Sequence, residues 1–118
     1  MRKPPFHKSV LNSIRGLGWM LKNERNFQLE FMALIINIIL ILIYKVDTAE
    51  ASLILILSAT VLCAEILNTA IEKICDVVEP NYDPKIGIIK DIAAGAVVLL
   101  AITAILVGLL VYPKYVFV

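Results

Sequence analysis

The feature that most restricts the fold is an uncharged run of 21 residues, from Ile92 to Tyr112. As a helix it would be about 31 Å long, which matches the hydrocarbon thickness of a bilayer. Hydrophobic residues make up 60% of the chain, against roughly 45–50% in ordinary soluble domains. The sequence therefore predicts an integral membrane protein.

Two shorter uncharged runs, Phe31 to Tyr44 and Ala51 to Ala64, precede the long one. A soluble domain of 118 residues could not bury so much apolar surface, so we interpret both runs as parts of longer membrane helices. We expect an all-α membrane protein with one domain over residues 1–118. The expected spans are 27–46, 48–78 and 84–112.

The segment before the first span is amphipathic. Its apolar residues recur at helical spacing, and its polar residues lie opposite them. This pattern predicts a helix over residues 8–25 that lies on the membrane surface and is retained in the mature protein. The apolar face is formed by Val10, Leu11, Ile14, Leu17 and Leu21, and the polar face by Lys8, Asn12, Arg15 and Lys22.

Both turns between spans carry helix-start signals. Asp47 or Thr48 can cap the second span. After the second span, Pro80 cannot continue a helix, whereas Asp83 followed by Pro84 fits an N-cap and a first helical position. We therefore expect a compact turn between the second and third spans.

The distribution of basic residues predicts the orientation. Of the 11 Lys and Arg residues, six precede the first span and three, Lys73, Lys85 and Lys90, lie around the turn after the second, whereas only Lys45 and Lys114 fall on the other side. The positive-inside rule then predicts that the N-terminus and the turn at 79–84 face the cytoplasm and that the C-terminus lies on the exterior side. A net charge of +1 gives no reason to expect a nucleic-acid partner.

One face of the second span is acidic. In the stretch AEILNTAIEKICD, five polar residues fall within an arc of roughly 100° on a helix. Carboxylates this close in a low-dielectric site need a cation or a proton role. The residue nearest the membrane surface, Asp76, has a plainer alternative, because water or Lys73 could pair with it. The five residues are Glu65, Asn68, Thr69, Glu72 and Asp76.

Other acids are expected at the same depth: Glu24 and Glu30 at the start of the first span, and Asp91 beside Lys90 at the start of the third. Several oxygen ligands without a His or Cys cluster suit Mg²⁺, which shares its coordination positions with phosphates.

Three further polar or sulfur residues have structural interpretations. Asn37 is expected to hydrogen-bond between helices near mid-membrane. Cys63 and Cys75 are expected to be reduced packing residues, because they are too far apart along one helix to bridge each other.

Three segments together resemble one family. NERNFQ at 23–28, EILNTAIEKICD at 65–76 and KDIAAGAVVL at 90–99 closely resemble the prokaryotic diacylglycerol kinases and undecaprenol kinases. The resemblance covers nearly the whole chain. It implies a small membrane lipid kinase with three spans and a surface helix, assembled as a homotrimer whose active sites are shared between neighbours.

The resemblance also implies roles for individual residues. Glu65 would be the general base and Asn68 would help to hold it, while Glu24 and Glu72 would bind Mg²⁺ at the phosphates of ATP. Asp76 and Glu30 would support the site. The nucleotide contacts would be Asn81, Tyr82, Asp83, Lys90 and Asp91.

The chain departs from the family pattern at two places. Relatives often carry a histidine or another charged residue in the turn, where this chain has Pro80 to Asp83, and an aromatic residue where it has Asn12. In the surface helix, Arg15 is our first choice for a phosphate contact. NERNFQ, LNTAIE and AAGAV are closer to the undecaprenol-kinase branch, so the resemblance favours undecaprenol as the acceptor.

Three alternatives remain at this point. The acceptor could be diacylglycerol, which would make phosphatidate the product. Membrane carboxylates also relay protons in small proton-coupled transporters, although a cluster at one interface suits that function less well. A non-catalytic membrane scaffold would tolerate the loss of each carboxylate.

Overall fold

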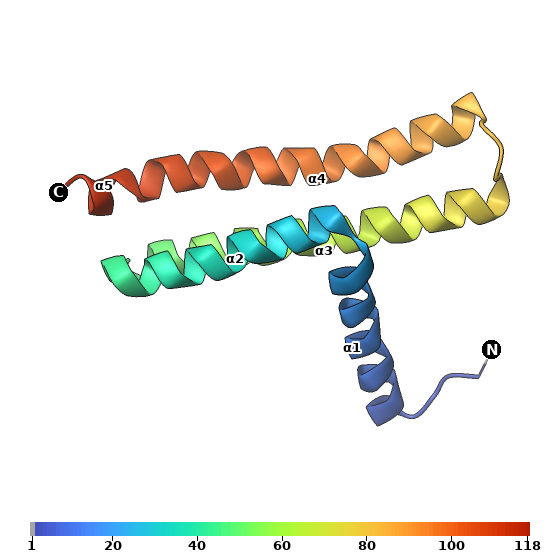
Figure 1. The fold of residues 1–118 in the computed structure, drawn as a ribbon, viewed down its shortest axis with the longest axis horizontal. Coiled ribbons are helices and arrows are strands. Elements are labelled where there is room, and N and C mark those ends of the chain that lie inside the picture. Colours follow the sequence, from blue (N-terminus) through green and yellow to red (C-terminus); the bar gives the residue numbers. More distant parts are fainter. Residues whose placement is uncertain (1) are drawn as a thin grey trace.

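The computed structural model describes residues 2–118, and within them the chain forms helices and no strand. Three helical segments are long and apolar enough to cross a membrane: Arg25–Tyr44, Thr48–Val78 and Pro84–Val116. These findings confirm the expected all-α class with three spans and an additional N-terminal helix (Figure 1). The helices are α1 (Phe6–Asn23), α2 (Arg25–Tyr44), α3 (Thr48–Val78), α4 (Pro84–Val111) and α5 (Pro113–Val116).

The first two helices lie two residues earlier than the expected ranges 8–25 and 27–46. Glu24 has extended backbone angles (φ −109°, ψ 111°), so α1 ends at Asn23 and α2 begins immediately afterwards. Lys45 adopts a left-handed conformation (φ 50°, ψ 50°), which ends α2 before Val46. The observed α3 has the expected ends, and α4 stops one residue before Tyr112.

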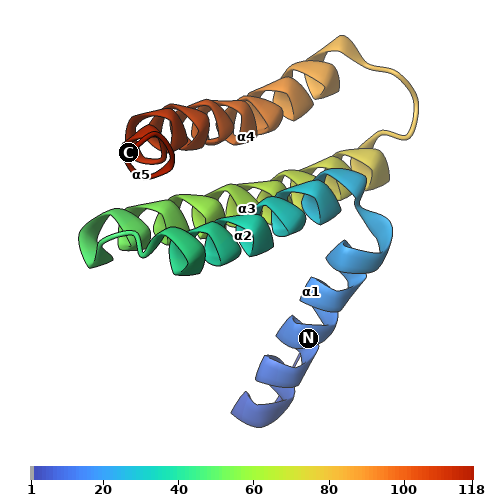
Figure 2. The ribbon, with the colours of Figure 1, turned by 60° about the vertical axis from the view of Figure 1, so that its left-hand side comes forward.

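Helix α3 is the centre of the bundle. It packs against α2 on one side and α4 on the other. Each of these three helices runs antiparallel to the next one along the chain (Figures 1 and 2). Helix α1 leaves this bundle at a steep angle at the Glu24 junction. The acidic face of α3 is therefore next to the elbow between α1 and α2.

The buried apolar residues form two separate clusters. Near the elbow, Met20 of α1 and Phe27 of α2 pack with Leu62 of α3. At the opposite end of the bundle, Val46, Ile54 and Val111 form the second cluster. The first cluster anchors α1 on the bundle and so fixes where Glu24 lies relative to α3.

The capping residues behave as the sequence predicts. Of the two candidates for the start of α3, Asp47 is the cap, and its Oδ1 accepts a hydrogen bond from the Glu50 amide at 2.9 Å. Asp83 Oδ1 accepts from the Lys85 amide at 2.8 Å, and Pro84 occupies the first turn of α4.

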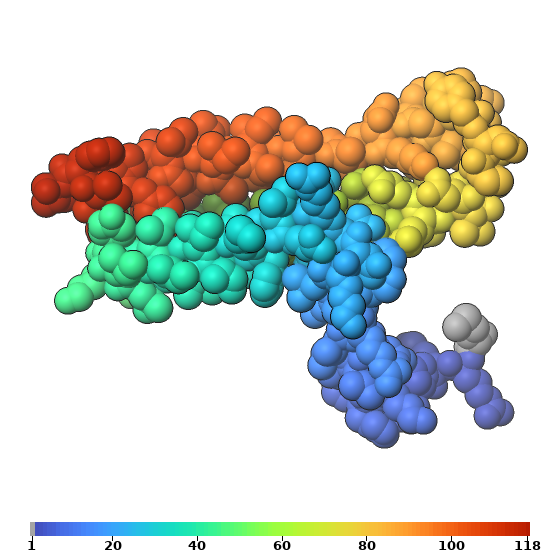
Figure 3. Space-filling model, in the orientation of Figure 1, coloured from blue at the N-terminus to red at the C-terminus, as the bar shows by residue number. Residues whose placement is uncertain are grey.

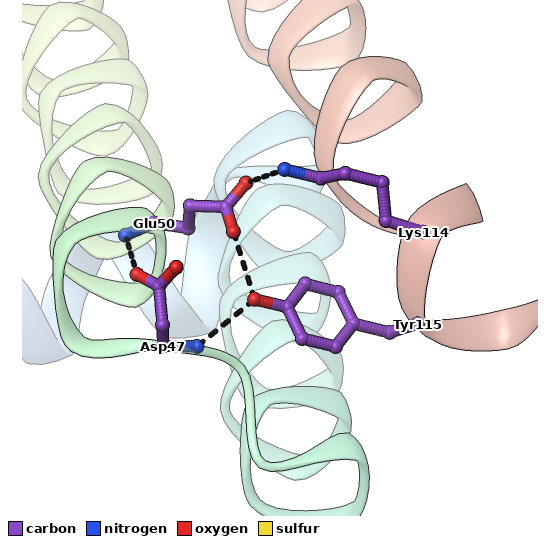
Figure 4. Close-up of polar contacts among 4 residues, drawn as sticks. All are labelled: Asp47, Glu50, Lys114 and Tyr115. Atoms are coloured by element: carbon purple, nitrogen blue, oxygen red, sulfur yellow. Dashed lines mark hydrogen bonds and ion pairs between the residues drawn. The ribbon is translucent and has the colours of Figure 1, made fainter. Parts of the chain in front are cut away.

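The short helix α5 is tied to the α2–α3 turn (Figure 4). The hydroxyl of Tyr115 accepts from the Asp47 amide at 3.1 Å and donates to Glu50 Oε1 at 2.7 Å. The ammonium of Lys114 pairs with Glu50 Oε2. These contacts hold the end of α4 against the α2–α3 hairpin, at the opposite end of α3 from Glu65, Glu72 and Asp76.

The cap at Asp47 predicts a pH-dependent stability. The Glu50 amide that donates to its carboxylate holds the pKa of Asp47 below its usual range. A depressed folded-state pKa stabilises the fold above the unfolded value of about 3.9, and this contribution is lost as the pH falls through the folded value. Asn also caps helices, so Asp47→Asn removes the charge and keeps a capping side chain. We expect the melting temperature of this variant at pH 7 to be lower than that of the wild type.

The same comparison at acid pH is the control. The two proteins differ only at residue 47, so the difference between their melting temperatures in detergent should shrink as Asp47 is protonated. A difference that stays constant from pH 7 to pH 3 would show that the Asp47 charge is not its cause.

Candidate active site

The acidic face of α3 changes from buried to exposed along the helix. Glu65, Asn68 and Thr69 are buried, with 4%, 7% and 4% of their surfaces exposed. Glu72 is half-buried and Asp76 is exposed. The predicted single face therefore runs from the bundle interior toward the α3–α4 turn.

Carboxylates from three parts of the chain surround Glu65. Glu24, at the elbow, and Glu72, about two helical turns further along α3, are close enough for their carboxylates to repel that of Glu65. Glu30 of α2 is likewise close enough to be repelled by Glu65. The fold thus brings together four acids that the sequence places in two separate segments.

The side chain of Asn68 bonds within α3. Its Nδ2 donates to Glu72 Oε1 at 3.2 Å, so the amide holds Glu72 here and not Glu65, for which the resemblance implied such a contact. Glu65 and Glu72 lie three and four residues from Asn68, so both are its neighbours on the helix surface, and the Asn68 side chain is turned toward Glu72.

Several oxygen atoms around this cluster are buried without a hydrogen-bond partner among the described residues. They are Glu30 Oε2, Asn68 Oδ1 and Thr69 Oγ1. Buried polar atoms are rarely left unpaired, and in a membrane the cost of doing so is greater than at a wet surface. The three atoms are therefore suited to contact a ligand.

No group of three or more His, Cys, Asp or Glu side chains within residues 2–118 has metal-site geometry. The available donors, Glu24 and Glu72 with nearby amide and hydroxyl oxygens, are hard ligands of the kind that Mg²⁺ prefers. Mg²⁺ commonly takes one or two protein carboxylates and completes its shell with water and phosphate. The donor set fits this ion, and its binding stays a prediction.

A groove of about 250 Å³ lies at the α3–α4 turn. It contains all five residues for which the resemblance implied nucleotide contacts, and also Asp76. Its polar lining residues are Asp76, Glu79, Asn81, Tyr82, Asp83, Lys90 and Asp91.

Asp76 pairs with Lys90 of α4, whose Nζ lies 2.6 Å from Asp76 Oδ1. The alternative of a pair with Lys73 is wrong. Lys73 points toward α1, and its Nζ lies 4.4 Å from the centre of the Trp19 ring, a cation–π distance. Lys90 reaches Asp76 because α4 packs antiparallel against α3. This packing could not be predicted from the sequence alone.

A second cavity, of about 520 Å³, lies between α1 and α3. Ser13 and Gly16 line it from α1, and Thr69 and Lys73 line it from α3. Arg15, our first choice for a phosphate contact in α1, is exposed and is absent from this lining. The sequence analysis missed Lys73 as a cation at this cavity. The helical spacing of Ser13, Gly16 and Met20 was the signal that could have located the inner face of α1.

A third cavity, of about 380 Å³, runs between α2 and α4 with α3 as its floor. We call it the α2–α4 groove. In the space-filling view, a furrow separates the two helices and atoms of α3 are visible within it (Figure 3). Glu30 lines one part of the groove and Asn37 another. Through Glu30, the groove reaches the acidic cluster.

The predicted hydrogen bond of Asn37 between helices is confirmed. Its Nδ2 donates to Ser58 Oγ of α3 at 3.2 Å, and its Oδ1 accepts from the Tyr112 hydroxyl at 2.7 Å. The Tyr112 partner was missed because it lies 75 residues away in sequence.

Both cysteines are free, as expected. Cys75 is buried, but Cys63 is exposed on the surface of this chain, so the packing role expected for Cys63 is wrong within a single chain.

The three candidate spans, with buried Glu65, Asn68 and Thr69 beside an open groove, define a small integral membrane protein with a buried polar site. The family model of the prokaryotic diacylglycerol kinases matches residues 11–112. The chain belongs to this family, and the protein is a lipid kinase.

Two characterised relatives agree with this assignment. The chain is 34% identical over 110 residues to undecaprenol kinase of Bacillus subtilis, covering 92% of this chain and 89% of that protein. It is 32% identical over 94 residues to diacylglycerol kinase of Synechocystis sp., covering 79% of this chain and 54% of that protein. The chain therefore matches about half of the cyanobacterial protein.

Proposed function

We propose that the protein transfers the γ-phosphate of ATP to the hydroxyl of a membrane lipid alcohol, and that undecaprenol is the acceptor. The observation that carries this proposal is the grouping of buried Glu65 with three other carboxylates, those of Glu24, Glu30 and Glu72, of which Glu30 also lines the α2–α4 groove. Similarity to an undecaprenol kinase over 92% of the chain favours that acceptor. Diacylglycerol is the second candidate, because a diacylglycerol kinase is also similar.

In this proposal Glu65 takes the proton of the lipid hydroxyl. Because Glu65 is buried, water competes little with the lipid hydroxyl for the phosphate. Phosphoryl transfer depends mainly on the positioning of the reactants and on a base near the acceptor oxygen. Glu24 and Glu72 would hold Mg²⁺, with Asn68 fixing the Glu72 carboxylate. The ion, when bound, neutralises charge that develops on the phosphates. Glu30 supports the site from α2.

The turn groove would hold the nucleotide. Lys90 supplies the positive charge there and is itself oriented by Asp76. Asn81, Tyr82, Asp83 and Asp91 line the same groove and would contact the nucleotide around it.

Removal of the Lys90 charge should weaken ATP binding. We expect Lys90→Met to raise the KM for ATP by about tenfold or more, since a charge-assisted hydrogen bond is worth roughly 1.5–3 kcal/mol. The KM for the lipid should change little. The matched control is Lys85→Met, because Lys85 lies five residues earlier on α4 and outside the groove lining. Equal KM values for ATP in the two variants would contradict the assignment of Lys90.

The proposed orientation places the N-terminus and the acidic cluster in the cytoplasm and the C-terminus outside the inner membrane. The excess of basic residues at the N-terminus and after α3 supports it. Helix α1 would lie on the membrane surface, since its apolar residues are not covered by the rest of the chain: Val10, Leu11, Ile14 and Leu17 are between 44% and 57% exposed. The whole chain would act as one kinase domain.

We also propose that the protein is a homotrimer with shared active sites. The large exposed apolar surface of α4 and the exposed position of Cys63 on α3 leave room for neighbours. Subunit mixing tests this proposal. If one protomer supplies Glu65 and its neighbour supplies Lys90, mixtures of Glu65→Gln and Lys90→Met should be more active than either variant alone. Mixtures without such a gain would mean that each site lies within one protomer.

Transfer of labelled phosphate tests the function itself. Purified protein in mixed micelles would be given γ-labelled ATP, Mg²⁺, and either undecaprenol, diacylglycerol or no added lipid. We expect label in the lipid fraction, with the higher kcat/KM for undecaprenol. Preference for diacylglycerol would reverse the order of the two candidates, and no label in either lipid would refute the proposal.

A further inference from the structure

The α2–α4 groove is closed at one end by hydrogen-bonded side chains from all three spans. Tyr112 of the third span donates to Asn37 of α2, and Asn37 donates to Ser58 of α3. Ser58 in turn donates to the Ile54 carbonyl at 2.8 Å. We call Asn37, Ser58 and Tyr112 the polar crossbar.

The other part of the groove contains Glu30, whose Oε2 is buried without a partner. Glu30 and Asn37 are seven residues apart on α2, which is about 10 Å along the helix axis. A lipid alcohol matches this arrangement, because its polar end would lie among the carboxylates, where Glu65 takes its proton, and its hydrocarbon tail would lie along the apolar walls of the groove.

The walls of the groove are mostly small. They are formed by Ala33 of α2 and by Ala101, Ala104 and Gly108 of α4. Small side chains leave width for a tail that carries methyl branches. The volume of about 380 Å³ lies in the range of ligand-binding pockets.

Little space continues beyond the crossbar. The next cavity, lined by Asn37, Ser58, Gly108 and Tyr112 among others, has about 30 Å³, which is room for about one water molecule. A tail that reaches the crossbar therefore has to leave the groove sideways into the bilayer.

Resting on the proposed function, we propose that the polar crossbar determines which lipid tails the kinase accepts. It stops the tail about 10 Å from the carboxylates and turns the remainder out between α2 and α4. A methyl-branched polyprenol fits the wide groove and bends readily at the single bonds that flank its double bonds. A straight saturated alcohol packs best when it continues parallel to the helices, and the crossbar blocks that path.

Two substitutions at Tyr112 test separately the effect of its ring, which blocks the groove, and that of its hydroxyl, which donates to Asn37. Tyr112→Ala opens the closed end, whereas Tyr112→Phe keeps the ring and removes only the hydroxyl. The measurement is the ratio of kcat/KM for a polyprenol to that for a straight saturated alcohol of similar length, in the same micelles. We expect the ratio to fall about tenfold in Tyr112→Ala, the size of effect typical of a changed apolar pocket, and to stay near the wild-type value in Tyr112→Phe.

A second pair of variants covers the case in which Tyr112→Ala does not fold. Ala104 lines both the groove and the small cavity, so Ala104→Phe should raise the KM for the polyprenol and leave the KM for ATP unchanged. Ile102 on the same helix is 52% exposed and lines neither cavity, which makes Ile102→Phe the matched control.

Three results would overturn the proposal for the crossbar: an unchanged ratio in Tyr112→Ala, an equal change in Tyr112→Phe, or equal lipid KM values for Ala104→Phe and Ile102→Phe. A wild-type protein that phosphorylates neither alcohol would instead overturn the proposed function on which this inference rests.

Discussion

Glu65→Gln is expected to lower kcat by roughly 10²–10⁴-fold, the range typical for loss of a general acid or base. The amide has nearly the same shape as the carboxylate but cannot accept the proton of the lipid hydroxyl. Because Glu65 is buried near Glu24, Glu30 and Glu72, its neutralisation also removes repulsion between like charges. The variant should therefore fold at least as well as the wild type.

Glu50→Gln is the matched control, because Glu50 lies on the same helix and holds Lys114 and Tyr115 at the far end of the bundle. It should lower the melting temperature in detergent and leave kcat unchanged at a temperature where it is folded. The two variants thus separate activity from stability. A Glu65→Gln protein with wild-type kcat would remove Glu65 from the role of base.

The second large effect is expected in the Mg²⁺ requirement. Glu24→Gln and Glu72→Gln should each raise the Mg²⁺ concentration for half-maximal rate by about tenfold or more, since even the loss of groups that only support metal ligands costs 10–100-fold in affinity. Added Mg²⁺ should restore part of the rate, which would distinguish these variants from Glu65→Gln. The measurement is the initial rate at saturating ATP over a series of Mg²⁺ concentrations.

Glu50→Gln again serves as control, because it changes a carboxylate far from the proposed ion and should keep the wild-type Mg²⁺ midpoint. Midpoints that do not move in Glu24→Gln and Glu72→Gln would show that these two residues are not the ligands.

Local features of the fold could be predicted from the sequence because they depend on neighbouring residues. The length of the third uncharged run, the Asp47 and Asp83 caps and the single acidic face of α3 are features of this kind. The helix ends at α1 and α2 were displaced by two residues, because the extended Glu24 and the left-handed Lys45 leave little sequence signal.

Contacts between distant segments could not be predicted in the same way. Which lysine pairs with Asp76 depends on how α4 packs on α3, and the position of Lys73 over Trp19 depends on the angle of α1. The Tyr112–Asn37 bond joins the first and third spans. The roles of individual acids came from the resemblance to a family, while periodicity indicated only that the acids share a face.

The central claim is that acids from the elbow and from α3 together hold a divalent ion at the phosphates of ATP. Mn²⁺ can replace Mg²⁺ and be followed by electron paramagnetic resonance in the presence of a non-hydrolysable ATP analogue. We predict that the wild type binds Mn²⁺ with magnetic coupling to phosphorus, and that the Glu24→Gln, Glu72→Gln double variant loses this bound signal. Equal Mn²⁺ binding and equal phosphorus coupling in the double variant would contradict the claim.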